Sequence, residues 1–356
     1  MKTELCTSNC NSSSQDHRPT PTEFLGLGDT DRAGQLLRDG KLVVIPTETV
    51  YGLAADATNA EAVQAIFLAK GRPQDNPLIV HVASVQAALE MIPPYLEAAR
   101  RGLSSFAPGP LTVVVPAPAG IASVVRGGLD TVALRVPAHP LAAAIIAAAG
   151  TPLAAPSANR SGRPSPTTFA MACWEMEGRV SAIVDGGDTD IGIESTVVDG
   201  TDSASLRILR PGSVSAEQLQ SAVGVPVYNP SEPASASHDP VHHRSPGTRY
   251  RHYQPALPVF AFYQEDWEEV RASIVQHRGG YARVVHISEL NVSAAREELE
   301  FVAMHSPEEY ARRLYREFRR AEEDGIRRLY LEIPPEAAAA GLRDRILRAA
   351  ATADRG

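Results

Sequence analysis

Lys70 and Arg72 flank a glycine at the predicted end of a helix, and Asn76 follows them in the run KGRPQDNPL. Arginine can bind two phosphate oxygens at once and lysine adds a point charge, so this pair of cations suits a triphosphate. The same side chains could instead stabilise the carboxyl end of the helix by interacting with its dipole. The run by itself leaves both interpretations open.

Hydroxyl groups and an amide follow two predicted strands. The run PTETVYG, which contains Thr49, comes directly after a strand at 42–46, and the run PSANRSGRP, which contains Ser157 and Asn159, comes after a strand at 153–155. In open α/β sheets, ligands bind beyond the carboxyl ends of the strands. A capped turn without a ligand is the simpler interpretation of the first run.

Two side chains that can carry charge lie inside otherwise apolar strands. Arg135 lies in the run TVALRVP, which begins at Thr131, and an arginine there is costly to bury unless it meets an anion. His81 lies in the run LIVHVA. A single histidine in such a strand is more often a satisfied core residue than a ligand.

Three further clusters follow strands of the same domain: DGG at 185–187, EST with Ser195, and RPG with Arg210. Two adjacent glycines allow the backbone to come close to a ligand. Because all of these clusters follow or interrupt strands of one domain, we expect them to converge on one concavity. The sequence contains no G-x-x-x-x-G-K-[ST], H-E-x-x-H or G-x-S-x-G motif, so several familiar catalytic arrangements are absent.

The elements that position these residues alternate between strand and helix over residues 24–229, which predicts a large mixed α/β domain. One helix is capped by Asn59 and ended by Gly71, and another covers 140–149. Besides the strand at 153–155, strands are predicted at 42–46, 78–83, 111–116, 132–136, 180–185, 195–199 and 206–210.

The remaining segments differ from this domain. Residues 1–23 are polar and rich in Ser and Asn, which predicts a disordered tail, and residues 230–256 have the composition of a linker. Residues 257–351 alternate again, and the run SPEE at 306–309 is typical of a capping box. The expected structure is a small parallel sheet covered by helices, Rossmann-like in shape. It has no G-x-G-x-x-G loop, and no dinucleotide is inferred. Its strands are predicted at 258–262, 282–286, 299–304 and 328–333, and its helices at 266–277, from 307 onwards, and at 342–350.

Length and charge narrow the possible functions. The 356 residues suffice for two domains, and the net charge of −8 argues against a protein that mainly coats nucleic acid. The three cysteines do not form a disulfide framework, and the spacing of Cys6 and Cys10 lacks a matching metal-ligand pair. The sequence has no run of 18 apolar residues and no signal-peptide pattern, so we expect a cytoplasmic protein without a membrane partner.

The combined order of motifs resembles the YrdC/Sua family of threonylcarbamoyl-AMP synthases in its long two-domain form. The runs that carry the resemblance are PTETVYGL, KGRP with NPL, PGPLT, ALRVP, PSANRSGRPSPTT, DGG, ESTVV and LRPG, followed by SPGTRYRHYQP in the linker. The resemblance implies a YrdC-like twisted mixed sheet with helices and a smaller Rossmann-like C-terminal α/β domain. The implied substrates are ATP, L-threonine and bicarbonate, with Mg²⁺ carried by ATP. The implied products are threonylcarbamoyl-adenylate and pyrophosphate.

The resemblance also assigns roles to residues. Lys70 and Arg72 are expected to hold phosphates and steady the leaving pyrophosphate. Tyr253 of the linker is expected to reach over the occupied pocket as part of a lid. The threonine side is implied to consist of Thr49, His81, Arg135 and Ser195, so that His81 becomes a ligand. The ATP side is implied to consist of Lys70, Arg72, Asn76, Thr131, Ser157, Asn159, Arg210 and Tyr253.

Partner proteins would transfer the threonylcarbamoyl group to tRNA, so contact with tRNA is expected only indirectly. Two alternatives are a carbamoyl-adenylate-forming enzyme on the same scaffold and a non-catalytic double-stranded RNA-binding module. The net charge and the full set of motifs argue against the second. The arginine pairs of residues 312–328 alternate with glutamates, which predicts a solvated helix face rather than an RNA-binding patch. The histidines at 238, 242 and 243 are interpreted as part of a flexible loop rather than a metal site.

Overall fold

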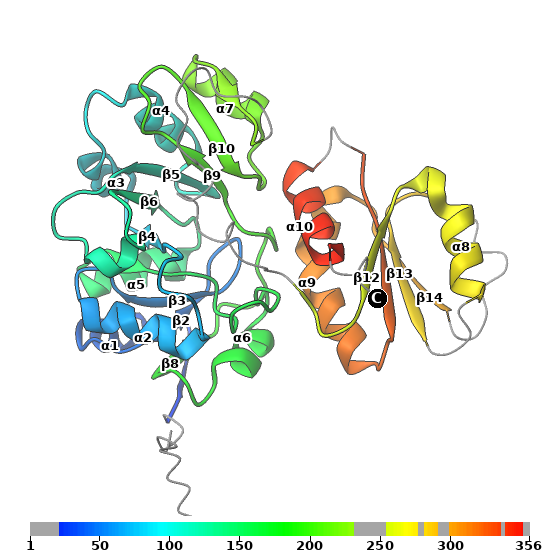
Figure 1. Ribbon diagram of the computed structural model, residues 1–356. Helices are drawn as coiled ribbons and strands as arrows, with labels where there is room; N and C mark the ends of the chain where they lie inside the picture. The colour runs from blue at the N-terminus through cyan, green and yellow to red at the C-terminus, as the bar shows by residue number, and fades with distance from the viewer. Residues whose placement is uncertain (1–20, 231–253, 277–280, 291–298, 336–338, 352–356) are drawn as a thin grey trace, which may run out of the picture.

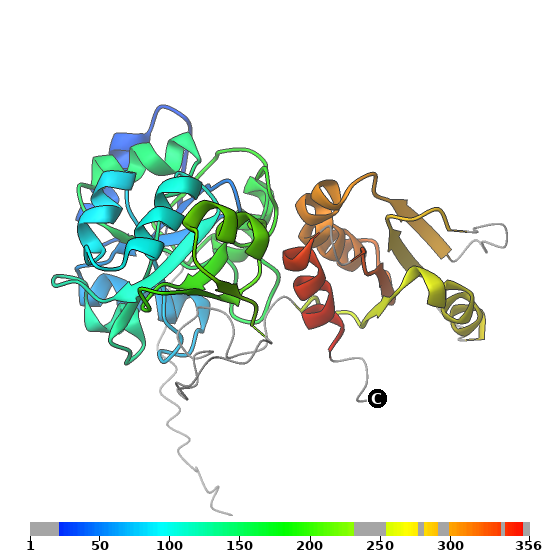
Figure 2. The ribbon, with the colours of Figure 1, turned by 90° about the horizontal axis from the view of Figure 1, so that it is seen from above.

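The computed structural model describes residues 21–230, 254–276, 281–290, 299–335 and 339–351. The predicted tail lies almost entirely outside these residues, as do most of the predicted linker and its Tyr253. The described residues form a large N-terminal α/β part and a smaller C-terminal one, which lie side by side in two perpendicular views (Figures 1 and 2).

A single mixed sheet runs through the N-terminal part. Its neighbouring strands pair in both directions: β2 and β3, for example, are antiparallel, whereas β4 and β6 are parallel. This confirms the predicted mixed sheet. In pairing order the strands are β1 (Glu23–Leu25), β8 (Ala182–Val184), β2 (Val43–Ile45), β3 (Gly52–Asp56), β7 (Leu153–Ala154), β4 (Ile79–His81), β6 (Thr131–Arg135), β5 (Leu111–Pro116), β9 (Thr196–Asp199), β10 (Leu206–Arg210) and β11 (Val227–Tyr228).

Helices cover both faces of this sheet. Helices α1 (Thr30–Arg38) and α5 (Pro140–Ala149) share a hydrophobic cluster with Val43 and Ile45 of β2, whereas Val44, on the opposite face of that strand, belongs to the main core. The helical elements that contribute to the main core are α2 (Ala60–Lys70), α3 (Val85–Met91), α4 (Glu97–Phe106), η1 (Ser123–Arg126), α6 (Phe169–Met176) and α7 (Ala216–Val223).

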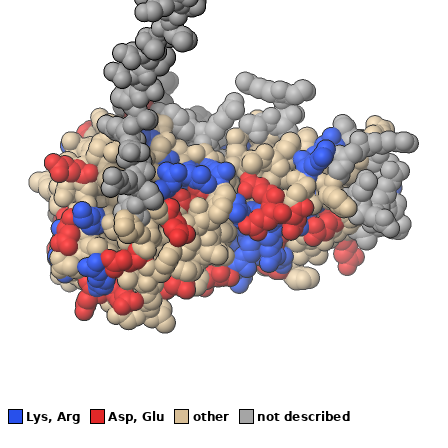
Figure 3. Space-filling view, turned by 90° about the horizontal axis from the view of Figure 1, so that it is seen from below, with Lys and Arg blue, Asp and Glu red and all other residues tan. Residues whose placement is uncertain are grey.

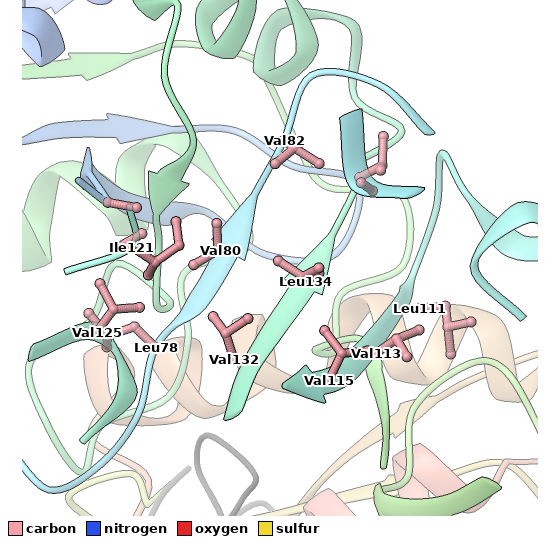
Figure 4. Close-up of a cluster of buried hydrophobic side chains, with 14 of the residues drawn as sticks. Leu78, Val80, Val82, Leu111, Val113, Val115, Ile121, Val125, Val132 and Leu134 are labelled. Atoms are coloured by element: carbon pink, nitrogen blue, oxygen red, sulfur yellow. The ribbon is translucent and has the colours of Figure 1, made fainter. Parts of the chain in front are cut away.

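The main core depends on the two-residue period of the strands. Alternate residues on and beside β4, β5 and β6 bring apolar side chains to one face, where burial of each large side chain contributes about 1.5–3 kcal/mol (Figure 4). The intervening residues, including His81 and Arg135, lie on the other face. The core residues shown are Leu78, Val80, Val82, Leu111, Val113, Val115, Val132 and Leu134, with Ile121 and Val125 beside them.

Local signals in the sequence place the ends of α2. The Asn59 side chain accepts hydrogen bonds from the N–H groups of Glu61 and Ala62, and Gly71 ends the helix in the left-handed conformation with φ 61°. Both ends were predicted, as were the bounds of α5. Strands β1 and β3 and helices α1, α3, α4, α6 and α7 were not predicted. The sequence of β3, GLAAD, lacks the β-branched residues that mark a strand.

The C-terminal part contains a small parallel sheet, as predicted. Its order is β12 (Val259–Phe262), β15 (Arg328–Glu332), β13 (Ala282–His286) and β14 (Leu299–Ala303). Helices α9 (Pro307–Glu323) and α10 (Ala340–Ala350) lie on the face towards the N-terminal part, and α8 (Trp267–Gln276), preceded by η3 (Gln264–Asp266), lies on the other face (Figures 1 and 2).

Helix α9 begins as predicted but differs in detail. Ser306 accepts the N–H of Glu309, whereas the Glu309 carboxylate accepts the N–H of His305, one residue before the cap. Along the helix, Arg313 pairs with Glu309 and Glu317, so the face is salt-bridged as expected. It is not solvated throughout, because Glu317 is buried and also lies near Arg283. Acidic and basic side chains are interspersed on the face shown in Figure 3. None of the helices in the described ranges has both the length and the apolar character needed to cross a bilayer.

Candidate active site

The predicted clusters converge on one pocket of the N-terminal part. The side chains come from the loop between β2 and β3, the end of α2, the strands β4 and β6, the loop after β7, and the chain at β9 and β10. Nine of the residues singled out from the sequence line this pocket: Thr49, Lys70, Arg72, His81, Arg135, Ser157, Asn159, Ser195 and Arg210.

His81 and Arg135 lie in one row across neighbouring strands. His81 of β4 is in register with Arg135 of β6, which is in register with Thr112 of β5. Ser195, the residue directly before β9, extends this row: its hydroxyl group lies 2.8 Å from that of Thr112. Polar groups of residues far apart in sequence are therefore adjacent on the pocket face of the sheet.

Arg135 forms a buried ion pair in this row. Its guanidinium is 2.8 Å from the carboxylate of Glu48, and both side chains are almost fully buried. Burial raises the pKa of Glu48, but the charge of Arg135 and its hydrogen bond outweigh this and hold the pKa below its usual value. Burial, with the nearby charge of Arg135, lowers the pKa of His81 to about 3, so the imidazole is neutral at physiological pH.

The cation pair and the loop after β7 are joined directly. The Lys70 ammonium donates hydrogen bonds to the backbone carbonyls of Ser157 and Asn159. Within that loop, the Ser157 hydroxyl donates to the Asn159 side-chain carbonyl at 2.5 Å. Burial, and next the charge of Arg72, lowers the pKa of Lys70 well below its usual value. Two runs whose residues the family resemblance assigned to the ATP side are thus in contact.

Arg72 and Arg210 are oriented by backbone carbonyls. Arg72 donates to the carbonyl oxygens of Asn76 and Pro77, at 3.3 and 2.9 Å. Arg210 donates to the carbonyl oxygen of Ser195, from its Nη2 at 3.0 Å. A β-bulge between Ile208 and Arg210 changes the register of β10, so that Ile208 packs in the core while Arg210 lines the pocket.

Glu194 connects the pocket to the C-terminal part. Its buried carboxylate accepts hydrogen bonds from Ser165 at 2.5 Å, from Arg345 of α10 at 2.8 Å and from Tyr315 of α9 at 3.1 Å. Burial raises the pKa of Glu194, but the charges of Arg345 and Arg210 outweigh this and lower it to about 2. The carboxylate is therefore ionised across the physiological range.

Some predicted residues lie elsewhere. Asn76 is fully buried beside Arg72, and Thr131 is buried at the start of β6, at the opposite end of the strand from Arg135. Neither lines the pocket, and Tyr253 is outside the described residues. Thr131 misses the pocket because the pocket lies at the carboxyl end of β6.

Glu48 and Glu194 were not predicted as site residues, although both stand inside runs that were quoted, next to Thr49 and Ser195. The sequence did carry a signal for both: each is an acidic residue within a polar run that was already assigned to the site. Thr47, Ser161, Arg163 and Ser165 also line the pocket and were not singled out.

The pocket is rich in cations. Lys70, Arg72, Arg135, Arg163 and Arg210 all line it, together with hydroxyl groups and the Asn159 amide. Such a lining suits a ligand with several anionic groups, such as a polyphosphate with a carboxylate beside it. It can position reactants and neutralise charge that develops on them.

The chain is similar to known proteins over both parts. A family model for Sua5, YciO and YrdC proteins, described as telomere recombination, matches residues 35–212, and a model described as the C-terminal domain of threonylcarbamoyl-AMP synthase matches residues 214–351. Threonylcarbamoyl-AMP synthase of Bacillus subtilis is 42% identical over 266 residues, which cover 74% of this chain and 75% of the relative.

An archaeal relative gives the same result. The threonylcarbamoyl-AMP synthase of Pyrococcus abyssi is 44% identical over 227 residues, 64% of this chain and 66% of the relative. The crystal structure of P. abyssi Sua5 complexed with L-threonine matches with a TM-score of 0.80 and 34% identity. That match covers 94% of this chain and 98% of the other, so the similarity in fold extends over both domains.

Proposed function

The chain belongs to the Sua5, YciO and YrdC family and carries the C-terminal domain of threonylcarbamoyl-AMP synthases. From this premise we propose that it makes threonylcarbamoyl-AMP and pyrophosphate from L-threonine, bicarbonate and ATP. The observation that carries the proposal is the pocket in which Lys70 contacts the loop of Ser157 and Asn159, opposite the row of His81 and Arg135.

The reaction needs no nucleophile from the protein. The threonine amine attacks the carbon of carbon dioxide and loses a proton, or attacks that of bicarbonate with loss of water, to form a carbamate. A carbamate oxygen then attacks the α-phosphorus of ATP, the bond to the bridging oxygen breaks, and pyrophosphate leaves. Orientation of the carbamate against ATP and stabilisation of the charge on the phosphates account for the catalysis.

The threonine side of the pocket would be the row on the sheet. The Arg135 guanidinium would bind the threonine carboxylate, and Glu48 would hold that guanidinium in place. The neutral His81 imidazole can accept or donate a hydrogen bond to the threonine hydroxyl without adding a charge. Thr49 and Ser195 would supply further hydroxyl groups at the edges of this row.

The nucleotide side would be the cations of α2 and β10 with the loop after β7. Lys70 and Arg72 would exchange backbone carbonyls for phosphate oxygens when ATP binds, while Arg210, Ser157 and Asn159 would contact the nucleotide. Asn76 would act through its carbonyl, which holds Arg72. The roles proposed for Thr131 and for Tyr253 as a lid have no supporting contact in the described residues.

We propose that Mg²⁺ arrives on the phosphates of ATP. Glu194, which lines the pocket, and Glu48, which lies behind Arg135, are each paired with arginine. The described residues contain no group of acidic, histidine or cysteine side chains arranged as a metal site. When bound, the ion would add positive charge to the triphosphate and so assist loss of pyrophosphate.

The adenylate would pass to a partner that transfers the threonylcarbamoyl group to tRNA. We propose that this chain contacts tRNA only indirectly, because Arg313, Arg319 and Arg320 of α9 pair with glutamates of the same helix, and such pairs reduce the positive charge available to phosphates. The cytoplasm, where ATP, threonine and tRNA meet, is the compartment proposed for this reaction.

The test is threonine-dependent release of pyrophosphate from ATP by the purified chain, with bicarbonate, Mg²⁺ and no tRNA. We expect release only when threonine and bicarbonate are both present, with threonylcarbamoyl-AMP detected by mass spectrometry. Release that requires carbamoyl phosphate instead of threonine would favour the carbamoyl-adenylate-forming alternative. Retention of double-stranded RNA without any pyrophosphate release would favour the binding module.

A further inference from the structure

We infer that the C-terminal domain completes the active site, with Arg345 and Tyr315 acting as positioning residues that hold Glu194 and, through it, two polar walls of the pocket. This inference rests on the proposed function for the identity of the reaction, but its structural basis is independent of that identity. The contacts on Glu194, the fit of the two parts and the connections from Glu194 into the pocket support it.

Glu194 is held by donors from three separate segments. Arg345 of α10 has no exposed surface and donates from Nε to Glu194 Oε2 at 2.8 Å. The Tyr315 hydroxyl of α9 donates to the same oxygen at 3.1 Å, and Ser165 donates to Oε1 at 2.5 Å. The two C-terminal helices and the loop after β7 therefore meet at a single carboxylate.

At two points the backbone of one part packs directly against the backbone of the other, with glycine at the contact. A Cβ atom added at Gly341, at the start of α10, would be 2.6 Å from the carbonyl oxygen of Gly212. One added at Gly192 would be 2.3 Å from the Cα atom of Arg312 in α9. Arg316 pairs with Asp188 at the edge of this contact. Such close approach leaves no space for the helices to shift without moving the segments that carry Glu194.

Apolar side chains of the N-terminal part also enter the core of the C-terminal part. Val50 and Ile193 are buried in the cluster that contains Leu314 of α9 and Leu342 of α10. Val50 follows Thr49 and Ile193 precedes Glu194, so the segments anchored in this cluster are the ones that line the pocket. Figures 1 and 2 show α9 and α10 lying between the small sheet and the N-terminal part.

Glu194 connects this interface to both sides of the pocket. Its neighbour in sequence, Ser195, contacts the Thr112 hydroxyl and accepts a hydrogen bond from Arg210. Ser165 lies in the same loop as Ser157 and Asn159, between β7 and α6, and all three line the pocket. A carboxylate that is buried without its arginine partner would protonate or move towards solvent, and the two walls would then lose their common anchor.

The expected consequence is a smaller fraction of molecules with a formed pocket. When only a fraction of the protein is competent to bind, the apparent affinity for each ligand falls by that fraction. Loss of Arg345 should therefore raise the KM values for threonine and for ATP together. A purely structural role would instead reduce the amount of folded enzyme and lower kcat while leaving both KM values unchanged.

The experiment measures threonine-dependent pyrophosphate release by the full chain carrying Arg345→Met, with Arg348→Met as the matched control. Arg348 lies one turn further along α10, is partly exposed and pairs with Asp344 of its own helix. A hydrogen bond to a charged group contributes enough that we expect Arg345→Met to raise both KM values by about tenfold or more. The control should stay close to the wild-type values. Equal KM values in the two variants would overturn the inference.

Two further variants cover the case in which Arg345→Met does not fold. The double variant Glu194→Gln with Arg345→Met removes both charges of the pair and leaves Asp344, the other partner of Arg345, paired with Arg348. Tyr315→Phe removes a single hydroxyl. Both should keep the wild-type circular dichroism spectrum and raise the two KM values. A folded double variant with wild-type KM values would overturn the inference.

The wild-type chain shows whether the proposed function itself fails, independently of the variants. If the wild-type chain releases no threonine-dependent pyrophosphate, calorimetric titration with a non-hydrolysable ATP analogue replaces the kinetic measurement. Weaker binding by Arg345→Met than by Arg348→Met would still support the inference, and equal binding would overturn it.

Discussion

Replacement of Glu48 by Gln tests whether the buried ion pair of the pocket stabilises the fold. Gln has the shape of Glu but no charge, so the Arg135 guanidinium would remain buried beside a neutral amide. The two charged groups are 2.8 Å apart, and the side chains of Arg135 and Glu48 are 4% and 6% exposed. Solvent therefore cannot take the place of the lost carboxylate.

The size of the effect follows from this burial. Two unit charges at 2.8 Å attract each other by roughly 6 kcal/mol at an effective dielectric constant of about 20, and desolvation offsets part of this. Removing one partner of a buried pair typically costs about 3–5 kcal/mol. Because the Gln carbonyl can still accept a hydrogen bond from Arg135, we expect a loss near the lower end, about 3 kcal/mol. For a domain of this size that loss corresponds to a fall in Tm of about 6–12 °C.

Thermal unfolding followed by circular dichroism at neutral pH measures this change. The matched control is Glu23→Gln, which removes the carboxylate of the Glu23–Arg32 pair. Both of its side chains are more than 40% exposed, and surface pairs of this kind contribute little, so the Tm of the control should stay near that of the wild type. If Glu48→Gln lowered the Tm no more than Glu23→Gln, the reasoning from burial would be refuted.

Three further predictions follow from the same structure. Lys70→Met should lower kcat/KM for pyrophosphate release by about 10²–10³, as loss of one charge-stabilising donor does. The Tm should change little, because removal of a buried ammonium offsets the loss of its hydrogen bonds to the carbonyls of Ser157 and Asn159. A Tm well below that of the wild type would show that Lys70 is mainly structural. Gly341→Ala should destabilise the chain by about 1–3 kcal/mol in urea unfolding, since the new Cβ meets the backbone of Gly212, whereas Gly28→Ala has open space and should change little. Equal midpoints for the two alanine variants would contradict the close packing. Glu194 has a folded-state pKa of about 2, below its unfolded value. Its contribution to stability is thus complete above about pH 4.5 and is lost as the pH falls towards 2, so Glu194→Gln should flatten the pH dependence of the unfolding free energy in that window. An unchanged slope would rule out this linkage.

The elements whose signals are local were predicted well. The side chain of Asn59 and the left-handed Gly71 set the ends of α2, and the largely apolar run LTVVVP placed β5 at its observed bounds. Short elements without such signals were missed. Strand β3 consists largely of small residues, and it forms because β2 and β7 lie on either side of it.

The candidate site was predicted as a set of residue types rather than as a geometry. The polar clusters after the strands indicated one concavity, and the structure places Lys70 against the carbonyls of Ser157 and Asn159. The pattern of β10 gave a misleading signal for Arg210. Strict alternation would put this residue on the same face as Ile208, and a bulge that depends on pairing with β9 turns it to the pocket.

The sequence alone indicated the class of chemistry in two ways. The cations, hydroxyl groups and amide of its short runs suited a triphosphate, and the order of these runs gave the family resemblance that implies the carbamate. Only the tertiary structure decided which charges neutralise one another. Glu48 pairs with Arg135, 87 residues further along the chain, and Glu194 pairs with Arg345 of the other domain, 151 residues further along. Strand register and the docking of helices determine which charged side chains pair, and both depend on contacts between distant segments. The contacts of the C-terminal domain with Glu194 at the pocket therefore depend on the packing of the two parts, which the sequence does not state.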